Sequence, residues 1–192
     1  MIGRISNPIP TRQASQNIFM NTDTTETASR LLIAQKSIES ARAYTLTLLE
    51  DLQDDEYFWT PAGCETHIAW QVGHIAYGQY GSVLFRGRGR KLEDGDLLST
   101  KFRKQFAKSS TPAAKDKTLD LQTIKDSFQR IYEQSLKELP HFDEHSLDDP
   151  IEPPHAAFAT KYGSLIFAAH HEMLHAGQIG LIRRLMGKSP VR

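Results

Sequence analysis

Hydrophobic residues recur at three- and four-residue steps in four separate stretches of the chain. They lie at about residues 24–53, at residues 66–85, from Leu121 to Leu139 and from Gly163 to Gly187. This spacing places apolar side chains on one face of an α-helix. We find no sustained alternation of period two and no internal repeat. The pattern therefore predicts an all-α protein in which four amphipathic helices form a bundle.

Long connections are expected between the second and third helices and between the third and fourth. In the first, the basic run Arg86–Lys91 is interpreted as a solvated loop, and short helical turns are expected between Leu97 and Phe106. In the second, prolines predict an irregular crossover over residues 140–161. The polar residues 1–23 are predicted to form a separate arm, so the bundle domain is expected to span residues 24–188.

The composition limits the classes of function. Lys plus Arg and Asp plus Glu number 23 each, so the 192-residue chain has a formal net charge of zero. This balance argues against nucleic-acid binding, because phosphate neutralisation needs clustered positive charge. The single cysteine, Cys64, excludes an intramolecular disulfide. Since there is neither a membrane-length apolar stretch nor a secretory signal, we expect a cytoplasmic protein with no membrane contact.

Two histidines on the fourth predicted helix suggest a metal site. His171 and His175 are four residues apart, so their side chains leave the same helix face one turn apart. Two imidazoles make a weak site, and a third ligand must come from elsewhere. His74 lies in the apolar run of the second helix and is expected to face inward, although a single histidine there is more often a hydrogen-bonded core residue. We predict that His74, His171 and His175 bind one divalent metal ion in the bundle core.

The segment His171–His175 also matches HExxH, the zinc-protease signature in which the glutamate is the general base. A zinc protease of this type needs a third ligand downstream, and the residues after His175 contain no His, Asp or Glu. A metalloprotease is therefore the weaker interpretation. Glu172 is one residue off the ligand face, so it is expected at a helix–helix boundary or behind the ligands.

Two amides and several aromatic residues are candidates for supporting roles. Gln71 lies three residues before His74 and Gln178 three residues after His175, so either could contact a ligand or the substrate. Ordinary surface amides are the alternative interpretation. A pocket near the metal could be lined by aromatic side chains that otherwise only fill the core, namely Trp59, Trp70, Tyr77 and Tyr80.

The remaining histidines and the cysteine carry weaker expectations. His67 could line the mouth of the pocket, with surface exposure as the alternative, and His170 is expected to point away from the pair. Cys64 precedes the second helix and is a candidate nucleophile, but a cysteine with no assured base is more often inert. Three histidines of the proline-rich connection are expected to be solvated, namely His141, His145 and His155.

Two motifs together resemble the DinB-like (DinB/YfiT) proteins. The segment Thr66–Ala76 is similar to the family's W-x-x-x-H motif on the second helix, here Trp70 to His74. The segment His171–Gly187 is similar to the family's fourth-helix ending, H-x-x-x-H-x-G-Q-I followed by an Arg-Arg pair and a glycine. The resemblance implies an up-up-down-down four-helix bundle, often a homodimer, with a three-histidine metal site.

Some members of that family are transferases or isomerases that depend on a low-molecular-weight thiol such as bacillithiol, mycothiol or glutathione. All-histidine ligation suits Zn, Ni or Fe, and three protein ligands leave positions open as in catalytic sites. We therefore predict a metal-binding protein that acts on a small molecule, as a hydrolase or a thiol-dependent S-transferase. The alternative is a non-catalytic dimeric bundle with a structural or vacant metal site.

Overall fold

The structure is a computed structural model that describes residues 22–191, with side chains from residue 30 onward. The predicted polar arm, residues 1–23, lies almost wholly outside the described residues. Within the described part, no helix is long and apolar enough to cross a membrane.

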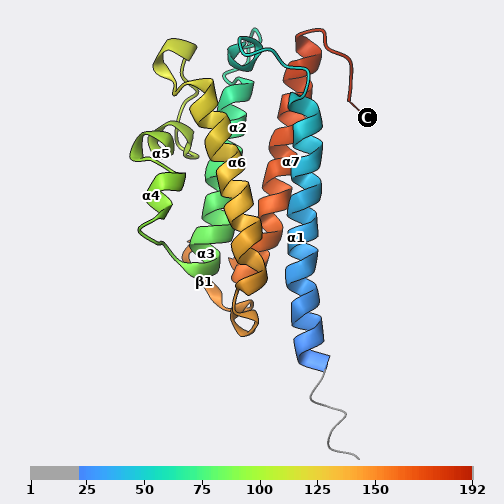
Figure 1. Cartoon of the computed structure of the whole chain (residues 1–192). Coiled ribbons are helices and arrows are strands. Elements are labelled where there is room, and N and C mark those ends of the chain that lie inside the picture. Colours follow the sequence, from blue (N-terminus) through green and yellow to red (C-terminus); the bar gives the residue numbers. More distant parts are fainter. Residues whose placement is uncertain (1–21, 192) are drawn as a thin grey trace, which may run out of the picture.

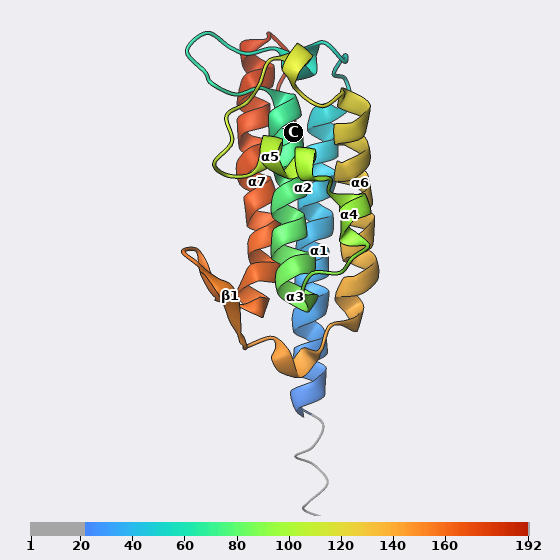
Figure 2. The same cartoon turned by 90° about the vertical axis from the view of Figure 1, so that its left-hand side faces the viewer.

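Four long helices lie side by side and make up most of the protein (Figures 1 and 2). They are α1 (Thr22–Leu49), α2 (Ile68–Gln79), α6 (Leu121–Glu138) and α7 (Lys161–Leu185). After α2 the helix continues through a π-helical segment, Tyr80–Phe85, and the short α3 (Arg86–Arg88). These elements confirm the four predicted helices within a few residues, and the fold is mostly helical.

The helix ends follow local side-chain chemistry. Asp120 begins α6 by accepting a hydrogen bond from the Thr123 N–H, and Thr160 begins α7 in the same way through the Gly163 N–H. These bonds satisfy backbone donors that the first helical turn leaves unpaired. At α2 the capping residue is His67, whose Nδ1 accepts from the Trp70 N–H at 3.1 Å.

The directions of the helices differ from the expected up-up-down-down order. In Figure 1, α1 rises, α2 and α6 both descend, and α7 rises. Helices α1 and α7 are parallel, because Arg42 pairs with Glu172 and, further along both helices, Leu48 accepts from Arg183. The observed order is up, down, down, up.

The antiparallel partner of α7 is α2. Ser164, near the start of α7, donates to the Ser82 carbonyl, whereas His175, further along α7, contacts Gln71 near the start of α2. The reason for the unexpected order is the segment between α3 and α6, which carries the chain back along the bundle before α6 begins. The connection between α6 and α7 stays at one end, so there is one lengthwise crossover and not two.

The lengthwise crossover contains two short helices, of which the second lies within the range expected to form helical turns. They are α4 (Asp94–Leu97) and α5 (Thr100–Phe106), and Figure 2 shows α5 lying across α2. The contact is close because Gly73 has no side chain: a Cβ at that position would come within 2.4 Å of the Phe106 ring. This packing brings the α5 backbone up to the middle of α2.

The basic run Arg86–Lys91 is a solvated loop only in its second half, because residues 89–91 are exposed and non-helical whereas Arg86–Arg88 continues the helix. Arg88 is largely buried and forms ion pairs with Asp94, at 2.7 Å, and with Glu138, at 2.8 Å. The prediction was wrong for Arg88, because its partner Asp94 lies beyond a turn and its partner Glu138 is distant in sequence. Arg88 thus links the start of the crossover to α6.

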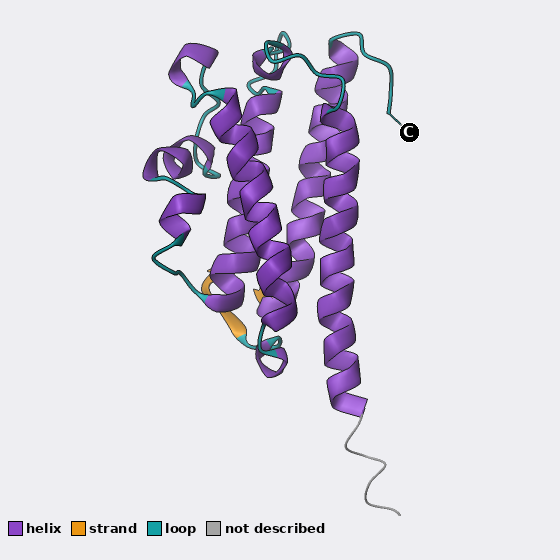
Figure 3. Cartoon of the chain, in the orientation of Figure 1, coloured by secondary structure: helices purple, strands orange, loops and turns teal. Residues whose placement is uncertain are grey.

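The proline-rich connection contains an antiparallel hairpin that periodicity did not predict (Figure 3). Strands β1 (Pro150–His155) and β2 (Phe158–Thr160) pair Pro150 with Thr160 and His155 with Phe158. A strand rich in proline at the edge of a two-stranded sheet has few ladder donors to lose. Since most of β1 is exposed, its sequence shows no alternation of apolar and polar residues.

A buried arginine joins all four long helices. The Arg42 side chain of α1 is 1% exposed, and its Nε donates to the Glu172 carboxylate of α7 at 2.8 Å. Its other nitrogens donate to the Gln79 amide oxygen of α2, at 2.8 Å, and to the Phe128 carbonyl of α6, at 3.0 Å. Because each partner is buried, this network sets how the helices are placed relative to one another.

Candidate metal centre

The three predicted ligands come together between α2 and α7. The Nε2 atom of His171 lies 3.3 Å from that of His74 and 3.2 Å from that of His175. Among the described residues, these three form the one group of His, Cys, Asp or Glu side chains whose ligand atoms could hold a metal ion, all within 4.8 Å of one another. The helices thus bring a residue of α2 to an i, i+4 pair about 100 positions later.

Hydrogen bonds behind the rings orient two of the imidazoles. The Nδ1 atom of His74 lies 2.7 Å from the Phe106 carbonyl oxygen, and that of His175 contacts the Gln71 amide oxygen. The Gln71 amide is held in turn, because its nitrogen donates to Thr66 Oγ1 at 2.8 Å. A carbonyl oxygen accepts only, so Nδ1 carries the proton in both rings and Nε2 presents a lone pair.

The lone pairs leave the cluster short of donors. With the Nε2 atoms of His74 and His175 unprotonated, a proton on His171 Nε2 could serve only one of the two close contacts. Burial, followed by the neighbouring imidazoles, lowers the pKa of His171 to about 4 and that of His175 to about 3. Burial also lowers the pKa of His74. The rings are therefore neutral near pH 7, which is the form that ligates a metal.

The spacing of the nitrogens fits a small divalent ion. A tetrahedral ion with metal–nitrogen distances of about 2.0–2.1 Å separates its ligand nitrogens by roughly 3.3–3.4 Å. The contacts of His171 at 3.2 and 3.3 Å agree with this. Because no fourth protein ligand belongs to the described cluster, an ion here would keep at least one position for water or substrate.

Close packing fixes the ring positions. The His74 ring stacks on Trp70, with centroids 4.7 Å apart and planes inclined by 8°. The His171 ring lies against Gly78, where a Cβ would come within 2.4 Å of the ring. Glycine at position 78 is therefore required by the close approach of His171 from α7. Glycine is less favourable than alanine within a helix, but its missing side chain lets His171 come near His74.

A cavity of about 650 Å³ opens beside the cluster, and all three histidines line it. Its walls include aromatic residues of two helices, Tyr77, Tyr80, Phe85 and Phe167. They also include four positive side chains, Arg86, Arg90, Arg103 and Lys108, and no Asp or Glu. The cavity is large enough for a drug-sized ligand.

Several expectations about supporting residues can now be judged. Gln71 does contact one of the predicted ligands, His175, whereas Gln178 is exposed on α7. Tyr77 and Tyr80 line the cavity and Trp70 supports His74, but Trp59 and Cys64 are not among the lining residues. The signal for Gln71 was its position one turn before His74 on the same helix.

The other histidines divide between confirmed and wrong predictions. His141, His145 and His170 are exposed, as expected. His67 is buried, but it caps α2 and bonds the Ala113 carbonyl at 2.9 Å, so both earlier interpretations were wrong. His155 was expected to be solvated, yet it lines the cavity and stacks on a neighbouring ring of the hairpin at 4.2 Å.

Sequence reasoning also missed the cationic wall of the cavity. Arg86 belongs to the helical continuation of α2, so it follows His74 along one continuous helical path. That continuity was the available signal. Arg103 and Lys108 come from α5 and its end, and only the crossover places them beside the histidines.

The HExxH glutamate faces away from the cavity. Glu172 is 2% exposed, pairs with Arg42 on α1, and is not among the lining residues. A buried carboxylate held by an arginine is not available to activate a water. The structure therefore bears out the helix-boundary expectation for Glu172 and opposes the metalloprotease interpretation.

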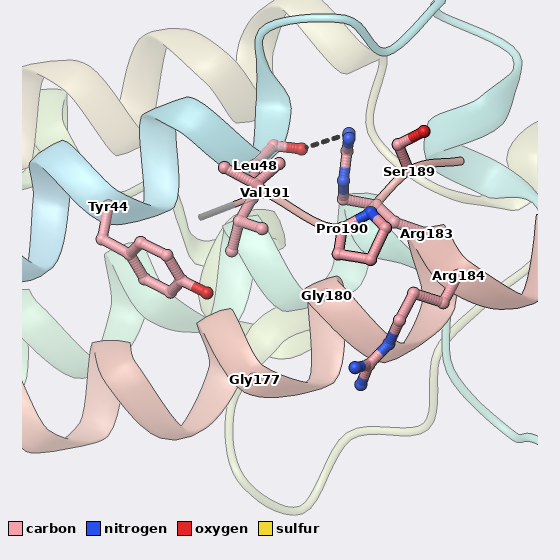
Figure 4. A pocket seen from close by; sticks show the side chains of 9 residues that line it. All are labelled: Tyr44, Leu48, Gly177, Gly180, Arg183, Arg184, Ser189, Pro190 and Val191. Atoms are coloured by element: carbon pink, nitrogen blue, oxygen red, sulfur yellow. Dashed lines mark hydrogen bonds between the residues drawn. The ribbon is translucent and has the colours of Figure 1, made fainter.

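A smaller hollow of about 120 Å³ lies at the far end of α7, between α1 and the C-terminal segment (Figure 4). Here the two arginines of the C-terminal motif have different roles. Arg183 is buried and donates to the Leu48 carbonyl at 2.7 Å and to the Asp51 carboxylate, whereas Arg184 is exposed. Arg183 thus joins the ends of α1 and α7 and is remote from the three histidines.

The fold and the site together define a mostly helical protein with a three-histidine cluster that could hold a metal ion. The sequence model of the DinB superfamily matches residues 37–179, and the chain belongs to that superfamily. The match includes all three clustered histidines. This agrees with the family resemblance that the two sequence motifs indicated.

A solved structure shows the same fold. The crystal structure of a conserved protein from Enterococcus faecalis is 18% identical to this chain, with a TM-score of 0.56. The similarity covers 86% of this chain and 98% of that one. No curated protein matches the chain.

Proposed function

We propose that this protein is a metal-dependent enzyme that acts on a small molecule, with transfer of a thiol to an electrophile as the favoured reaction. The observation that carries the proposal is the convergence of three Nε2 atoms on the wall of a cavity of about 650 Å³. A purely structural ion is usually enclosed by four protein ligands, whereas three ligands beside a cavity are typical of a catalytic site.

In this proposal, His74, His171 and His175 hold the ion on a DinB-like four-helix bundle. A divalent ion such as Zn, Ni or Fe would act there as a Lewis acid and lower the pKa of a thiol or water that binds it. Gln71 and the Phe106 carbonyl keep two of the rings in the ligating tautomer. The cavity excludes bulk water from one side and positions the organic reactant.

Thiol transfer is favoured over hydrolysis by the composition of the cavity. No Asp or Glu lines it, so the protein offers no carboxylate as a general acid for the leaving group that a hydrolysis must release. A thiol that loses its proton on binding a metal can add to an electrophilic double bond without releasing a leaving group, and so needs no such acid. Hydrolysis is the competing reaction, and the homodimer expected from the family resemblance stays a prediction.

The first test is metal stoichiometry by elemental analysis after dialysis against Zn, Ni or Fe. His175→Ala should abolish stoichiometric metal, and His170→Ala is the matched control because that histidine is exposed on the same helix and lies outside the cluster. Full metal content in His175→Ala would refute the site assignment.

The second test is a reaction. The loaded protein is incubated with an electrophilic dye and each of glutathione, bacillithiol and mycothiol, and adduct formation is followed by absorbance. Metal-dependent turnover with one thiol supports the proposal. A large fall in melting temperature on chelation, with no turnover of any thiol or ester, would favour the structural alternative.

A further inference from the structure

The cavity beside the histidines carries positive charge that the protein does not neutralise. Arg86, Arg90, Arg103 and Lys108 all line it, and no carboxylate does. Among the described residues, none of the four forms an ion pair. By contrast, Arg88 close by is paired with two carboxylates. Uncompensated cations in a cavity attract a ligand of opposite charge.

Arg86 has a buried donor that the protein does not use. Its Nη1 donates to the Gly81 carbonyl at 3.0 Å, and its Nε is buried without a partner. Arg103 shows the same pattern, because its Nη2 donates to the Leu98 carbonyl and its Nε is buried without a partner. Buried donors are almost always paired in proteins, so two such arginines in one cavity require an explanation.

The rest of the wall is suited to an organic body. Tyr77, Phe85 and Phe167 line the cavity, and the Phe167 centroid lies 5.6 Å from the His171 ring. The guanidinium of Arg86 lies 5.5 Å from the centroid of Phe158 in the hairpin. A ligand that spans these features has an anionic end near Arg86 and an apolar part that reaches toward the histidines.

We propose that the cavity binds a small organic carboxylate, with the carboxylate held by Arg86, assisted by Arg103, and the apolar part against the aromatic wall. A planar guanidinium with free donors matches a carboxylate better than an ammonium does. The proposal deepens the proposed function and rests on it for the statement that this ligand is the substrate. The binding of the anion itself requires only the cavity.

The test is calorimetric titration of the full chain with 4-phenylbutanoate, and with 4-phenylbutanamide as the uncharged counterpart. We expect the carboxylate to bind at least tenfold more tightly than the amide, and added salt to weaken it. Arg86→Gln should weaken the carboxylate at least tenfold and leave the amide unchanged. Arg130→Gln is the matched control, because it removes the same charge from an exposed position of α6, and it should change the affinity less than twofold.

Additional variants and ligands test the proposal if Arg86→Gln does not fold. If Arg86→Gln misfolds, as seen by circular dichroism, Arg86→Lys and Arg103→Gln replace it, and each should weaken the carboxylate. Equal affinity for carboxylate and amide, or tighter binding of phenyl phosphate than of the carboxylate, would overturn the proposal.

The metal site is tested separately in the same titration. His175→Ala should lose metal and still bind 4-phenylbutanoate in an Arg86-dependent manner. If His175→Ala keeps its metal, the proposed function fails while the anion site stands. If metal is lost as expected but Arg86→Gln binds normally, the anion site fails and the metal site stands.

Discussion

Replacing Glu172 should destabilise the protein severely without abolishing the metal binding proposed for the three histidines. The perturbation is Glu172→Ala, which leaves the guanidinium of Arg42 buried, at 1% exposed, without its carboxylate partner. Two hydrogen bonds from Arg42 to this carboxylate are also lost, at 2.8 and 3.3 Å. Removing one partner of a buried ion pair typically costs about 3–5 kcal/mol, because the remaining charge is uncompensated.

The loss of stability should appear as a lower melting temperature and should be reversed by a second substitution. For a chain of this length, about 1 kcal/mol corresponds to roughly 2–4 °C in melting temperature, so Glu172→Ala should melt at least about 6 °C lower. The double variant Arg42→Met, Glu172→Leu removes both charges and should recover most of the stability, because a well-packed apolar pair often replaces a buried ion pair at no cost.

The assay is urea denaturation followed by circular dichroism, on metal-free protein so that metal binding does not add to the stability. Elemental analysis of the reloaded variant shows whether the site survives. A loss of less than 1 kcal/mol for Glu172→Ala would refute the assigned role of the ion pair. Loss of metal with unchanged stability would instead show that Glu172 contributes to metal binding.

Two further predictions concern packing and charge. Gly78→Ala should displace the His171 ring, because a Cβ at position 78 would come within 2.4 Å of it, and should weaken metal binding at least tenfold in a competition titration. Gly177→Ala is the control, because a Cβ there meets open space, and it should leave the metal affinity unchanged. Equal metal affinities for the two variants would contradict the packing argument. Hydrogen bonding to Arg88 lowers the pKa of Asp94 to about 2, so this pair stabilises the protein above about pH 4, and the stability is lost as the pH falls toward 2. In Arg88→Met that acid-induced loss should shrink by about 2 kcal/mol in urea titrations at pH 7 and pH 2.5, and an unchanged loss would refute the assignment.

Local periodicity was enough to predict the four helices and two of the three clustered histidines. Apolar spacing of three and four residues depends on helix geometry alone, and His171 and His175 share a face for the same reason. The embedding of His74 in an apolar run predicted that it faces inward. Its meeting with the pair was predicted from the bundle pattern, and the motifs of the family strengthened that prediction.

The sequence could not predict what depends on contacts between distant segments. The hairpin went unpredicted because an exposed, proline-rich edge strand has no alternating pattern. The course of the crossover decides the helix order, and it also brings Phe106 behind His74 and Arg103 into the cavity. Arg88 appeared to be part of a solvated basic run because its partner Glu138 is 50 residues away.

The sequence by itself thus determined the helices and the histidines of the cluster, since both follow from local spacing and from short motifs. Only the tertiary structure decided the role of Glu172, because a carboxylate next to His171 can face either the histidine cluster or Arg42 on another helix. It also decided the charge of the cavity, because a chain with no net charge can still gather unpaired arginines on one wall. Burial and pairing are properties of the packed chain, and they give these residues their chemistry.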